Sequence, residues 1–399
     1  MKILMLVPFL PIDQMSGGQT RWYHMIKNLS KDHEITLMSL IKDEWERDYI
    51  PEIEKYCKKV YVFNRPKSPW TFRNLFLTLI TFNPLVVIRN YSLDEAKAIK
   101  RELSENKYDL IHAETFYVMP HIPNTDIPIV LVEPTIEYSV YKHYVDNEVN
   151  FLLKPIYMFD VFKLKLWERF YWHKATKLFA VSHEDQIIMQ NDMVGVSVGV
   201  IPNGVDVAHY EAKKIKRKSP PRILYHGNFK WMQNVEAVKL LVNDIWPKVK
   251  ARFNDVYLLI SGRNIPQEII DYSKDDSRIE ILESVDDNRD VYKASSILVT
   301  PIRGPGGTRL KVLEALASGL PVVSTPVGVA GLGIKVGKEA LVSHSLDKLS
   351  DYIVYLLKHP SAAKDIGNNG KKFVAKKFDW KGIVNQLNTV YDQIGKKDG

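Results

Sequence analysis

The stretch from Gly304 to Gly328 has the residue types and spacing of an anion-binding site. A glycine-rich turn leads into a short predicted helix that carries two cations in its first turn and a carboxylate one turn later. Backbone N–H groups in such a turn, together with the N-terminus of the helix that follows, bind phosphate groups. The pattern therefore predicts a site for a diphosphate with a sugar at one end and a ribose at the other, formed by Gly306, Gly307, Thr308, Arg309, Lys311 and Glu314.

Each charged residue of this stretch has an expected role. We expect Arg309 and Lys311 to contact the diphosphate, because cations in the first turn of a helix are unfavourable against its dipole unless an anion lies there. Glu314 shares a helix face with Gly307 and Lys311, and we expect it to accept hydrogen bonds from the ribose hydroxyl groups. The alternative is a surface glutamate that pairs with Lys311.

Two further glycine turns follow apolar stretches. Gly17 and Gly18 are expected to let the backbone approach the diphosphate or the sugar, the alternative being a simple tight turn. Gly227 follows a second apolar stretch, and Lys230 in the next turn can supply another cation for the diphosphate.

Three polar residues of the first half are candidates for contact with a second ligand. Arg21 follows the first glycine turn and is placed to reach a phosphate or another anion. His112 ends a predicted strand and Glu114 follows it by two residues, at the edge of a sheet where ligands bind in open α/β folds. For His112 the alternative is a structural histidine with satisfied hydrogen bonds.

The elements that must position these residues repeat one plan. An apolar strand at 2–7, a glycine loop, a helix at about 19–29 and a strand from Glu34 form a βαβ unit, which is typical of a parallel sheet. Later strands of the first half are predicted at 60–63, 110–112, 129–132, 178–181 and 199–201. The second half has predicted strands from 222, 256, 278 and 297 and helices at about 234–250 and 288–294. The fold class is therefore α/β, with two doubly wound parallel sheets.

At 399 residues the chain is too long for one ordinary core, and two domains are expected. We place an N-terminal Rossmann-like domain at 1–204, a C-terminal one at 205–378, and an amphipathic helix at 379–399 that returns to the N-terminal domain. A run of lysines and arginine followed by Pro220-Pro221 predicts that 205–221 is a solvated linker.

The composition is that of a globular protein with 45% hydrophobic and 26% charged residues. A net charge of +8 favours anionic partners, but no spacing typical of nucleic-acid-binding modules is present, so nucleic acid is not expected. Cys57 is the single cysteine, which fits a reducing compartment. The longest apolar stretch, 75–88, contains Asn83-Pro84 and is too short to span a bilayer, and the first residues predict a buried strand rather than a signal peptide.

Four motifs resemble those of retaining glycosyltransferases of family 4. They are SGGQTR at 16–21, VIPNGVD at 200–206, HGNFKWMQN at 226–234 and GGTRLKVLEALASGLPVVST at 306–325. The resemblance implies the GT-B fold, in which two Rossmann-like domains face each other and a C-terminal helix crosses back. It implies a UDP- or GDP-linked sugar held mostly by the C-terminal domain and an acceptor held mostly by the N-terminal one. Arg21, His112 and Glu114 are then the expected acceptor-binding residues, and neither a metal nor a cofactor is expected.

The chain departs from the family pattern at two places. Gly306 stands where relatives often have the first of two glutamates that are separated by seven residues, the second being Glu314 here. After the strand PIVLV the chain reads Glu133-Pro134-Thr135, where many relatives have a histidine near the reacting carbon. We expect Glu133 or Glu137 to take over that polar role, and we expect Lys311 to stabilise the leaving nucleoside diphosphate.

The expected function is transfer of a sugar to a glycan or lipid-linked acceptor in cell-surface polysaccharide or glycoconjugate synthesis. Two stretches that mix aromatic and basic residues, 68–91 and 151–177, fit either core helices or a peripheral contact with the inner face of a membrane. The expected location is cytoplasmic. The alternatives are a non-catalytic accessory subunit of the same fold and a sugar-nucleotide epimerase.

Overall fold

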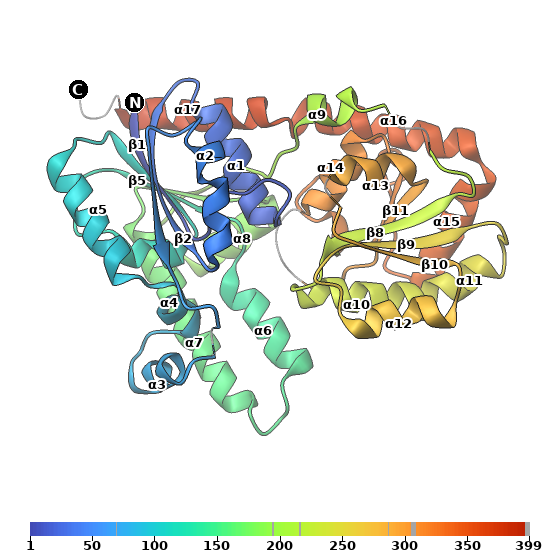
Figure 1. Cartoon of the computed structure of the whole chain (residues 1–399), viewed down its shortest axis with the longest axis horizontal. Coiled ribbons are helices and arrows are strands. Elements are labelled where there is room, and N and C mark those ends of the chain that lie inside the picture. The colour runs from blue at the N-terminus through green and yellow to red at the C-terminus, as the bar shows by residue number, and fades with distance from the viewer. Residues whose placement is uncertain (69, 194, 215–216, 286, 305–308, 396–399) are drawn as a thin grey trace. The chain divides into compact units, whose positions relative to one another are not determined.

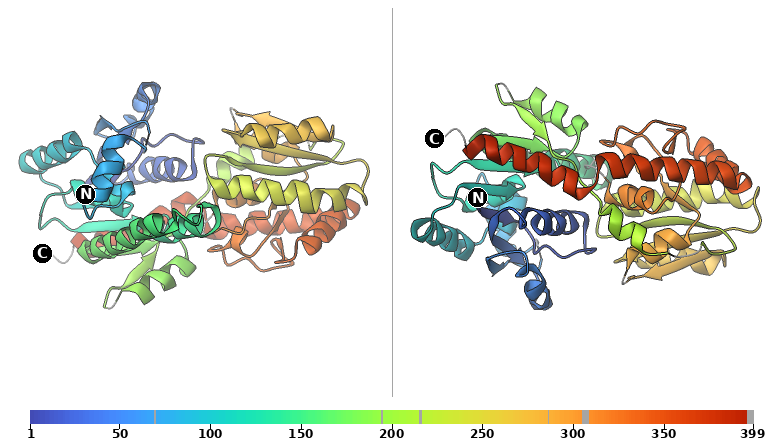
Figure 2. Two further views of the ribbon diagram at one scale, coloured as in Figure 1. Left: turned by 90° about the horizontal axis from the view of Figure 1, so that it is seen from below. Right: turned by 90° about the horizontal axis from the view of Figure 1, so that it is seen from above.

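The structure is a computed structural model that describes the chain except residues 69, 194, 215–216, 286, 305–308 and 396–399 (Figure 1). The described residues form two compact units. Unit 1 contains Met1–Pro202 and the described residues from Ile383 onward, and unit 2 contains the described residues from Asn203 to Gly382. Each unit is built around one parallel sheet with helices on both faces (Figure 2).

The described strands of unit 1 form a seven-stranded parallel sheet in the order β3-β2-β1-β4-β5-β6-β7. Because helices cover both faces, its central strands are almost continuously apolar; in β1 every residue after Lys2 is buried. The strands are β1 (Lys2–Val7), β2 (Glu34–Ile41), β3 (Lys59–Asn64), β4 (Leu110–Glu114), β5 (Ile129–Glu133), β6 (Lys177–Ala180) and β7 (Val198–Val200).

Four of the eight described α-helices of unit 1 begin at a serine or threonine whose side chain caps the helix. Ser16 caps α1 by accepting a hydrogen bond from the backbone N–H of Gln19, and Ser92 and Ser182 cap α5 and α8 in the same way. The helices are α1 (Gly17–Leu29), α2 (Ile50–Ile53), α3 (Phe72–Ile80), α4 (Leu85–Asn90), α5 (Leu93–Glu105), α6 (Glu137–Glu148), α7 (Lys154–Lys174) and α8 (His183–Asp192), with 3₁₀ turns η1 (Glu44–Tyr49) and η2 (Phe116–His121).

The described strands of unit 2 form a six-stranded parallel sheet in the order β10-β9-β8-β11-β12-β13. Its two faces bury separate hydrophobic clusters: Ile223 and Tyr225 of β8 belong to one cluster, and Leu224 between them belongs to the other. The strands are β8 (Arg222–Asn228), β9 (Tyr257–Arg263), β10 (Ile279–Glu283), β11 (Ile297–Thr300), β12 (Val322–Ser324) and β13 (Leu341–Val342).

The helices of unit 2 correct the sequence-based expectation at two places. Residues 207–212, expected in a solvated linker, form α9, whose Val207 and Tyr210 are buried in the unit 2 core. The helix expected at 234–250 is α10 (Met232–Leu240) followed by a π-helical turn (Leu241–Ile245) and α11 (Trp246–Lys250), because Pro247 has no N–H to continue an α-helical ladder. The others are α9 (Val207–Ala212), α12 (Gln267–Asp275), α13 (Asn288–Ala294), α14 (Leu310–Ala317), η4 (Val327–Val329), α15 (Leu346–Lys358) and α16 (Pro360–Lys377).

The last helix, α17 (Trp380–Gly395), starts in unit 2 and contributes the C-terminal part of unit 1. In unit 1 the Tyr391 hydroxyl lies 2.7 Å from Nδ1 of His112 in β4, and Asn388 contacts His33 in the turn before β2. None of the helices in the described part of the chain is both long enough and apolar enough to cross a bilayer.

Candidate active site

Two glycines fix the backbone at the carboxyl ends of β8 and β9 in unit 2. Gly262 has φ +147°, and a Cβ there would lie 1.7 Å from the carbonyl oxygen of Gly227, so no larger residue fits. A Cβ on Gly227 would lie 2.7 Å from Nζ of Lys311 in α14. The glycine at 227 thus leaves the space in which the Lys311 ammonium group sits.

Lys311 is the most perturbed cation of this site. Its ammonium group donates to Oδ1 of Asn234 (2.7 Å) and to the Tyr225 hydroxyl (3.3 Å), and it lies 4.4 Å from the centre of the Tyr225 ring. Burial, together with repulsion from Arg309, lowers the pKa of Lys311 from 10.5 to about 7. The side chain is therefore held at the end of a strand without a carboxylate as its hydrogen-bond partner.

Asn234, which the sequence analysis did not single out, organises the site. Its Oδ1 also accepts a hydrogen bond from the Tyr225 hydroxyl (2.8 Å), and its Nδ2 donates to the backbone oxygen of Asn228 (2.7 Å). One buried amide thereby joins β8, the turn after it and α14. The position of an asparagine at the start of a helix after a glycine turn is the signal that could have identified it.

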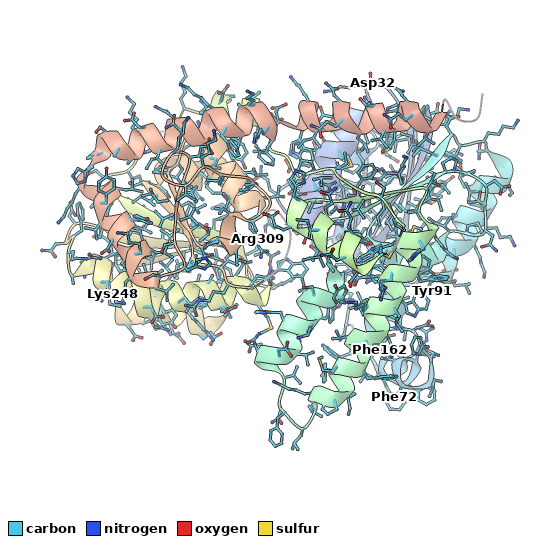
Figure 3. The ribbon with its side chains drawn as sticks, turned by 180° about the vertical axis from the view of Figure 1, so that it is seen from behind. Asp32, Phe72, Tyr91, Phe162, Lys248 and Arg309 are labelled. Atoms are coloured by element: carbon cyan, nitrogen blue, oxygen red, sulfur yellow. The ribbon has the colours of Figure 1, made fainter. Side chains whose placement is uncertain are left out.

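Arg309 and Glu314 lie at opposite ends of the first turns of α14. Arg309 occupies the N-cap position, and its guanidinium donates to the backbone oxygen of Gly304 (2.8 Å); Figure 3 labels this side chain. Glu314 accepts a hydrogen bond from the Tyr292 hydroxyl (2.7 Å), so the expected alternative of a surface pair with Lys311 is wrong. His226, next to Gly227, is buried close to two cations, and burial lowers its pKa to about 3.

The remaining predicted donor residues have simpler surroundings. Gly306, Gly307 and Thr308 lie outside the described residues. Lys230 is exposed in the turn after β8. Gly17 and Gly18 form the first turn of α1 in unit 1, where a Cβ on Gly18 would lie 3.1 Å from the Trp22 ring. These two glycines are thus at the helix N-terminus that follows β1, as the sequence indicates.

The three expected acceptor residues form a buried network instead. The side chains of Arg21, His112 and Glu114 are at most 1% exposed. Glu114 accepts hydrogen bonds from Trp22 (2.9 Å) and Arg21 (3.3 Å) and contacts His112 (3.1 Å). Burial opposes ionisation of Glu114, but Arg21 and His112 outweigh it and lower its pKa. Because their polar atoms are used inside unit 1, we replace the expected acceptor role of these residues with a structural one.

Arg21 extends this network to the end of the unit 1 sheet. Its guanidinium donates to the backbone oxygens of Pro202 (3.0 Å) and Ile201 (3.3 Å), just after β7. The Tyr391 hydroxyl closes the network at His112. The cluster therefore connects α1, β4, the segment after β7 and α17 through polar contacts in the interior.

Glu133, expected to be catalytic, also lies in the interior of unit 1. Its side chain is 1% exposed and accepts a hydrogen bond from the Trp172 indole (3.0 Å). Burial and the nearby Glu168 raise its pKa well above 4.5. A carboxyl group in this position does not reach a substrate, and its role is structural.

Glu137 remains a candidate for contact with substrate. It is the first residue of α6, half-buried, and its backbone N–H and that of Tyr138 donate to the carboxylate of Glu168 (2.8 and 2.9 Å). Burial raises the pKa of Glu137 to about 7, although Arg89 acts in the opposite direction. In the described parts of the chain, no cluster of three or more His, Cys, Asp or Glu side chains is arranged to hold a metal ion.

Comparison with known proteins agrees with this architecture. The family model described as "Glycosyltransferase Family 4" matches residues 15–209, and the one described as "Glycosyl transferases group 1" matches residues 220–359. Together they cover most of unit 1 and most of unit 2. The protein is a glycosyltransferase, and it belongs to the family 4 type.

Individual relatives are distant but similar over the whole chain. An "Uncharacterized 44.6 kDa protein in cps region" of Klebsiella pneumoniae is 24% identical and covers 97% of this chain and 98% of its own length. The solved sucrose-phosphate synthase of Thermosynechococcus elongatus matches with a TM-score of 0.72 at 18% identity over 98% of both chains. The Anabaena protein HepE, solved with UDP and glucose, matches with a TM-score of 0.66 at 15% identity over 98% of this chain and 100% of its own. These structures show that the chain has the GT-B fold.

Proposed function

We propose that the protein transfers a sugar from a nucleotide-diphosphate sugar to a glycan or lipid-linked acceptor, with retention of the anomeric configuration and without a metal ion. The observation that carries this proposal is the position and the burial of the Lys311 ammonium group. The group lies over the glycine at the carboxyl end of β8, and burial lowers its pKa to about 7. A buried cation whose hydrogen-bond partners are neutral is suited to binding an anion. HepE is described in complex with UDP-glucose, which supports a donor of this class.

In this proposal, unit 2 stabilises the leaving group. The bond between the anomeric carbon and the β-phosphate oxygen breaks, and Lys311 and Arg309 stabilise the charge that develops on the diphosphate. The acceptor hydroxyl oxygen forms the new bond to the anomeric carbon on the same face of the sugar, and its proton passes to the departing phosphate oxygen. Glu314, fixed by Tyr292, accepts hydrogen bonds from the ribose. Lys230 and the glycine turns, including Gly17 and Gly18, are proposed as further donor contacts.

Glu137 is proposed as the polar group that replaces the family histidine in unit 1. It follows β5 at the carboxyl edge of the sheet, and a carboxyl group with a pKa of about 7 can accept a hydrogen bond or a proton at neutral pH. The Klebsiella relative is described as lying in a cps region, which supports an acceptor among cell-surface glycans.

The direct test is transfer of radiolabelled sugar from UDP- and GDP-linked donors to glycan and lipid-linked acceptors. Lys311→Met is expected to lose at least about a hundredfold in rate, the usual effect of removing one group that stabilises developing charge. Lys358→Met, which removes an exposed lysine of α15, serves as the matched control. An accessory subunit would show no turnover in either form, and an epimerase would convert donor without acceptor; either result would refute the proposal.

A second proposal concerns an apolar surface formed by α3 and the first half of α7, here called the α3–α7 surface. It carries the exposed apolar side chains of Phe72 (84% exposed), Leu79, Ile156 and Phe162, and the turn before α7 adds Phe151 and Leu152. Figure 3 labels Phe72 and Phe162. The two elements are connected, since Lys163 donates to the backbone oxygen of Thr78 (2.8 Å) and Trp167 to that of Phe82 (3.0 Å).

We propose that the α3–α7 surface contacts an anionic membrane. The stretch from 151 to 174 has five lysines and arginines but only two acidic residues, and Arg73 is exposed beside Phe72. Apolar side chains surrounded by cations are typical of proteins that bind the interface of an anionic bilayer. A lipid-linked acceptor would be presented at the same interface.

Cosedimentation with vesicles tests this contact. The protein is expected to bind vesicles that contain phosphatidylglycerol more tightly than vesicles of phosphatidylcholine alone. Phe72→Ser with Phe151→Ser is expected to weaken binding at least about tenfold, since each buried phenylalanine contributes up to about 2–3 kcal/mol. Leu282→Ser with Val336→Ser, on exposed positions of unit 2, is the control. Equal binding by both double variants, or a dimer in light scattering that these changes disrupt, would overturn the proposal.

A further inference from the structure

Two arginines at the carboxyl edge of the unit 1 sheet are poorly paired for their degree of burial. Arg65 directly follows β3, and Arg89 lies near the end of α4. Figure 1 labels the helix α4. Both side chains are half-buried, and the Nε atom of each is enclosed by protein with no hydrogen-bond partner among the described residues. Arg89 makes neither a hydrogen bond nor an ion pair with any residue that the structure describes.

The two guanidinium groups are near enough for their charges to repel, and Arg65 contacts the residue that follows Arg89 in the chain. Burial lowers the pKa of Arg65, and repulsion from Arg89 lowers it further. Arg65 is fixed by neutral contacts: it lies 4.2 Å from the centre of the Phe9 ring and donates to Oδ1 of Asn90 (3.1 Å). Asn90 is itself held, because its Nδ2 donates to the backbone oxygen of Val86 (2.8 Å). The protein thus orients a cation without neutralising it.

The acidic groups around this pair are engaged elsewhere or weakly ionised. Oε1 of Glu46 accepts two backbone N–H groups at 2.9 Å, and Asp43 pairs with Lys67 (3.1 Å). Glu137 is near enough to Arg89 to be affected by its charge, yet burial keeps its pKa at about 7. Buried donors without partners are rare in proteins, so each of the two enclosed Nε atoms calls for an explanation.

We propose that Arg65 and Arg89 bind an oxyanion of the acceptor, either the carboxylate of an acidic sugar or a phosphate. This inference rests on the proposed transferase function and adds the chemical class of the acceptor to it. Planar guanidinium groups bind carboxylates and phosphates through paired hydrogen bonds. The terminal N–H groups of Arg89 have no hydrogen-bond partner among the described residues and can make such bonds. Phe9 follows β1, Arg65 follows β3 and Arg89 lies in α4. The segments after β1 and β3 lie at the carboxyl edge of the sheet, where ligands bind in open α/β folds.

The test measures thermal stabilisation by small probes in the full-length protein. Methyl β-D-glucuronide carries the carboxylate, glycerol 1-phosphate the phosphate, and methyl β-D-glucoside is the neutral match. One or both anions are expected to raise the melting temperature of the wild type, whereas the glucoside leaves it unchanged. A larger response to the glucuronide identifies an acidic sugar, and a larger response to glycerol phosphate identifies the phosphate of a lipid-linked acceptor.

Arg65→Gln and Arg89→Gln are each expected to weaken probe binding at least about tenfold. Arg101→Gln, on the exposed side of α5, is the matched control and should bind like the wild type. Arg89→Lys keeps the charge but loses the planar fork, so intermediate affinity is expected from it even if a glutamine variant folds poorly. The absence of a response to both anions, or an undiminished response in the glutamine variants, would overturn the inference.

A parallel titration with UDP separates this inference from the proposed function. Lys311→Met should lose the response to UDP and keep the response to the acceptor probes. If UDP stabilises the wild type but neither anionic probe does, only the anion site is wrong. If the probes bind and UDP does not, the proposed donor site is wrong while the arginine pair stands.

Discussion

Binding of a nucleoside diphosphate should be coupled to protonation of Lys311. In the empty protein the pKa of this residue is lowered from 10.5 to about 7. That lowering corresponds to about 5 kcal/mol by which the empty site disfavours the charged form. A diphosphate beside the ammonium group supplies the missing negative charge, so the bound protein should hold Lys311 fully protonated well above pH 7.

The affinity for UDP should consequently fall as the pH rises above about 7. The terminal phosphate of the nucleotide is already ionised above about pH 7.5, so its own titration does not contribute there. Each further pH unit then weakens binding up to about tenfold, because one proton must be taken up for each nucleotide bound. The slope should persist until the pH approaches the pKa that Lys311 has in the complex.

Isothermal titration calorimetry at pH 8.5, in two buffers with different ionisation enthalpies, measures the proton uptake directly. The wild type and Lys358→Met should take up close to one proton per UDP, and Lys311→Met should bind weakly with little uptake. Equal affinity for UDP at pH 7 and pH 9 in the wild type would refute the reasoning. So would a slope that survives in Lys311→Met.

Three further predictions concern stability. Gly262→Ala should destabilise the protein by more than about 3 kcal/mol in denaturant unfolding, because its Cβ would overlap a backbone oxygen at φ +147°, whereas Gly382→Ala, with open space around it, should not destabilise it. Burial raises the pKa of Glu95 to about 8, so the free energy of unfolding should fall as the pH rises from about 4.5 to 8. Glu95→Gln should remove this fall and be more stable than the wild type at pH 8 by a value on the order of 4 kcal/mol. The same dependence of stability on pH in both proteins would contradict this prediction. Tyr391→Phe removes the hydroxyl group that lies 2.7 Å from Nδ1 of buried His112, and it should lower the free energy of unfolding in urea by about 1–3 kcal/mol. An unchanged unfolding midpoint would contradict this prediction.

The sheets were predictable because their signal is local. Each predicted strand is a short apolar run bounded by turn residues, and both faces of a parallel sheet bury such runs. The glycine turns at 17–18 and 227 were predictable for a similar reason, since a backbone constraint selects glycine wherever it occurs. The exceptions, α9 and the π-helical turn before α11, depend on burial against unit 2 and on a single proline.

The roles of the charged residues were harder to predict because they depend on partners that are distant in the sequence. His112 and Glu114 have the types and position of ligand-binding residues, but Tyr391, 279 residues away from His112, occupies the histidine. Burial in the folded unit raises the pKa of Glu133, an effect of tertiary packing that no local sequence pattern indicates. Arg65 and Arg89 drew no attention in the sequence, because what indicates a ligand is the effect of each charge on the other and the unpartnered Nε atoms, and both arise only in the fold.

The contribution of α17 to unit 1 has a consequence for biosynthesis. Residues Ile383, Leu387 and Tyr391 are buried, and Tyr391 completes a polar network whose other members were translated hundreds of residues earlier. All seven strands of the sheet are synthesised before α17. Until Tyr391 has been synthesised, His112 in β4 lacks the hydroxyl group that it contacts in the folded protein. Within this sequence, unit 1 therefore receives its last structural element only after unit 2 has been synthesised.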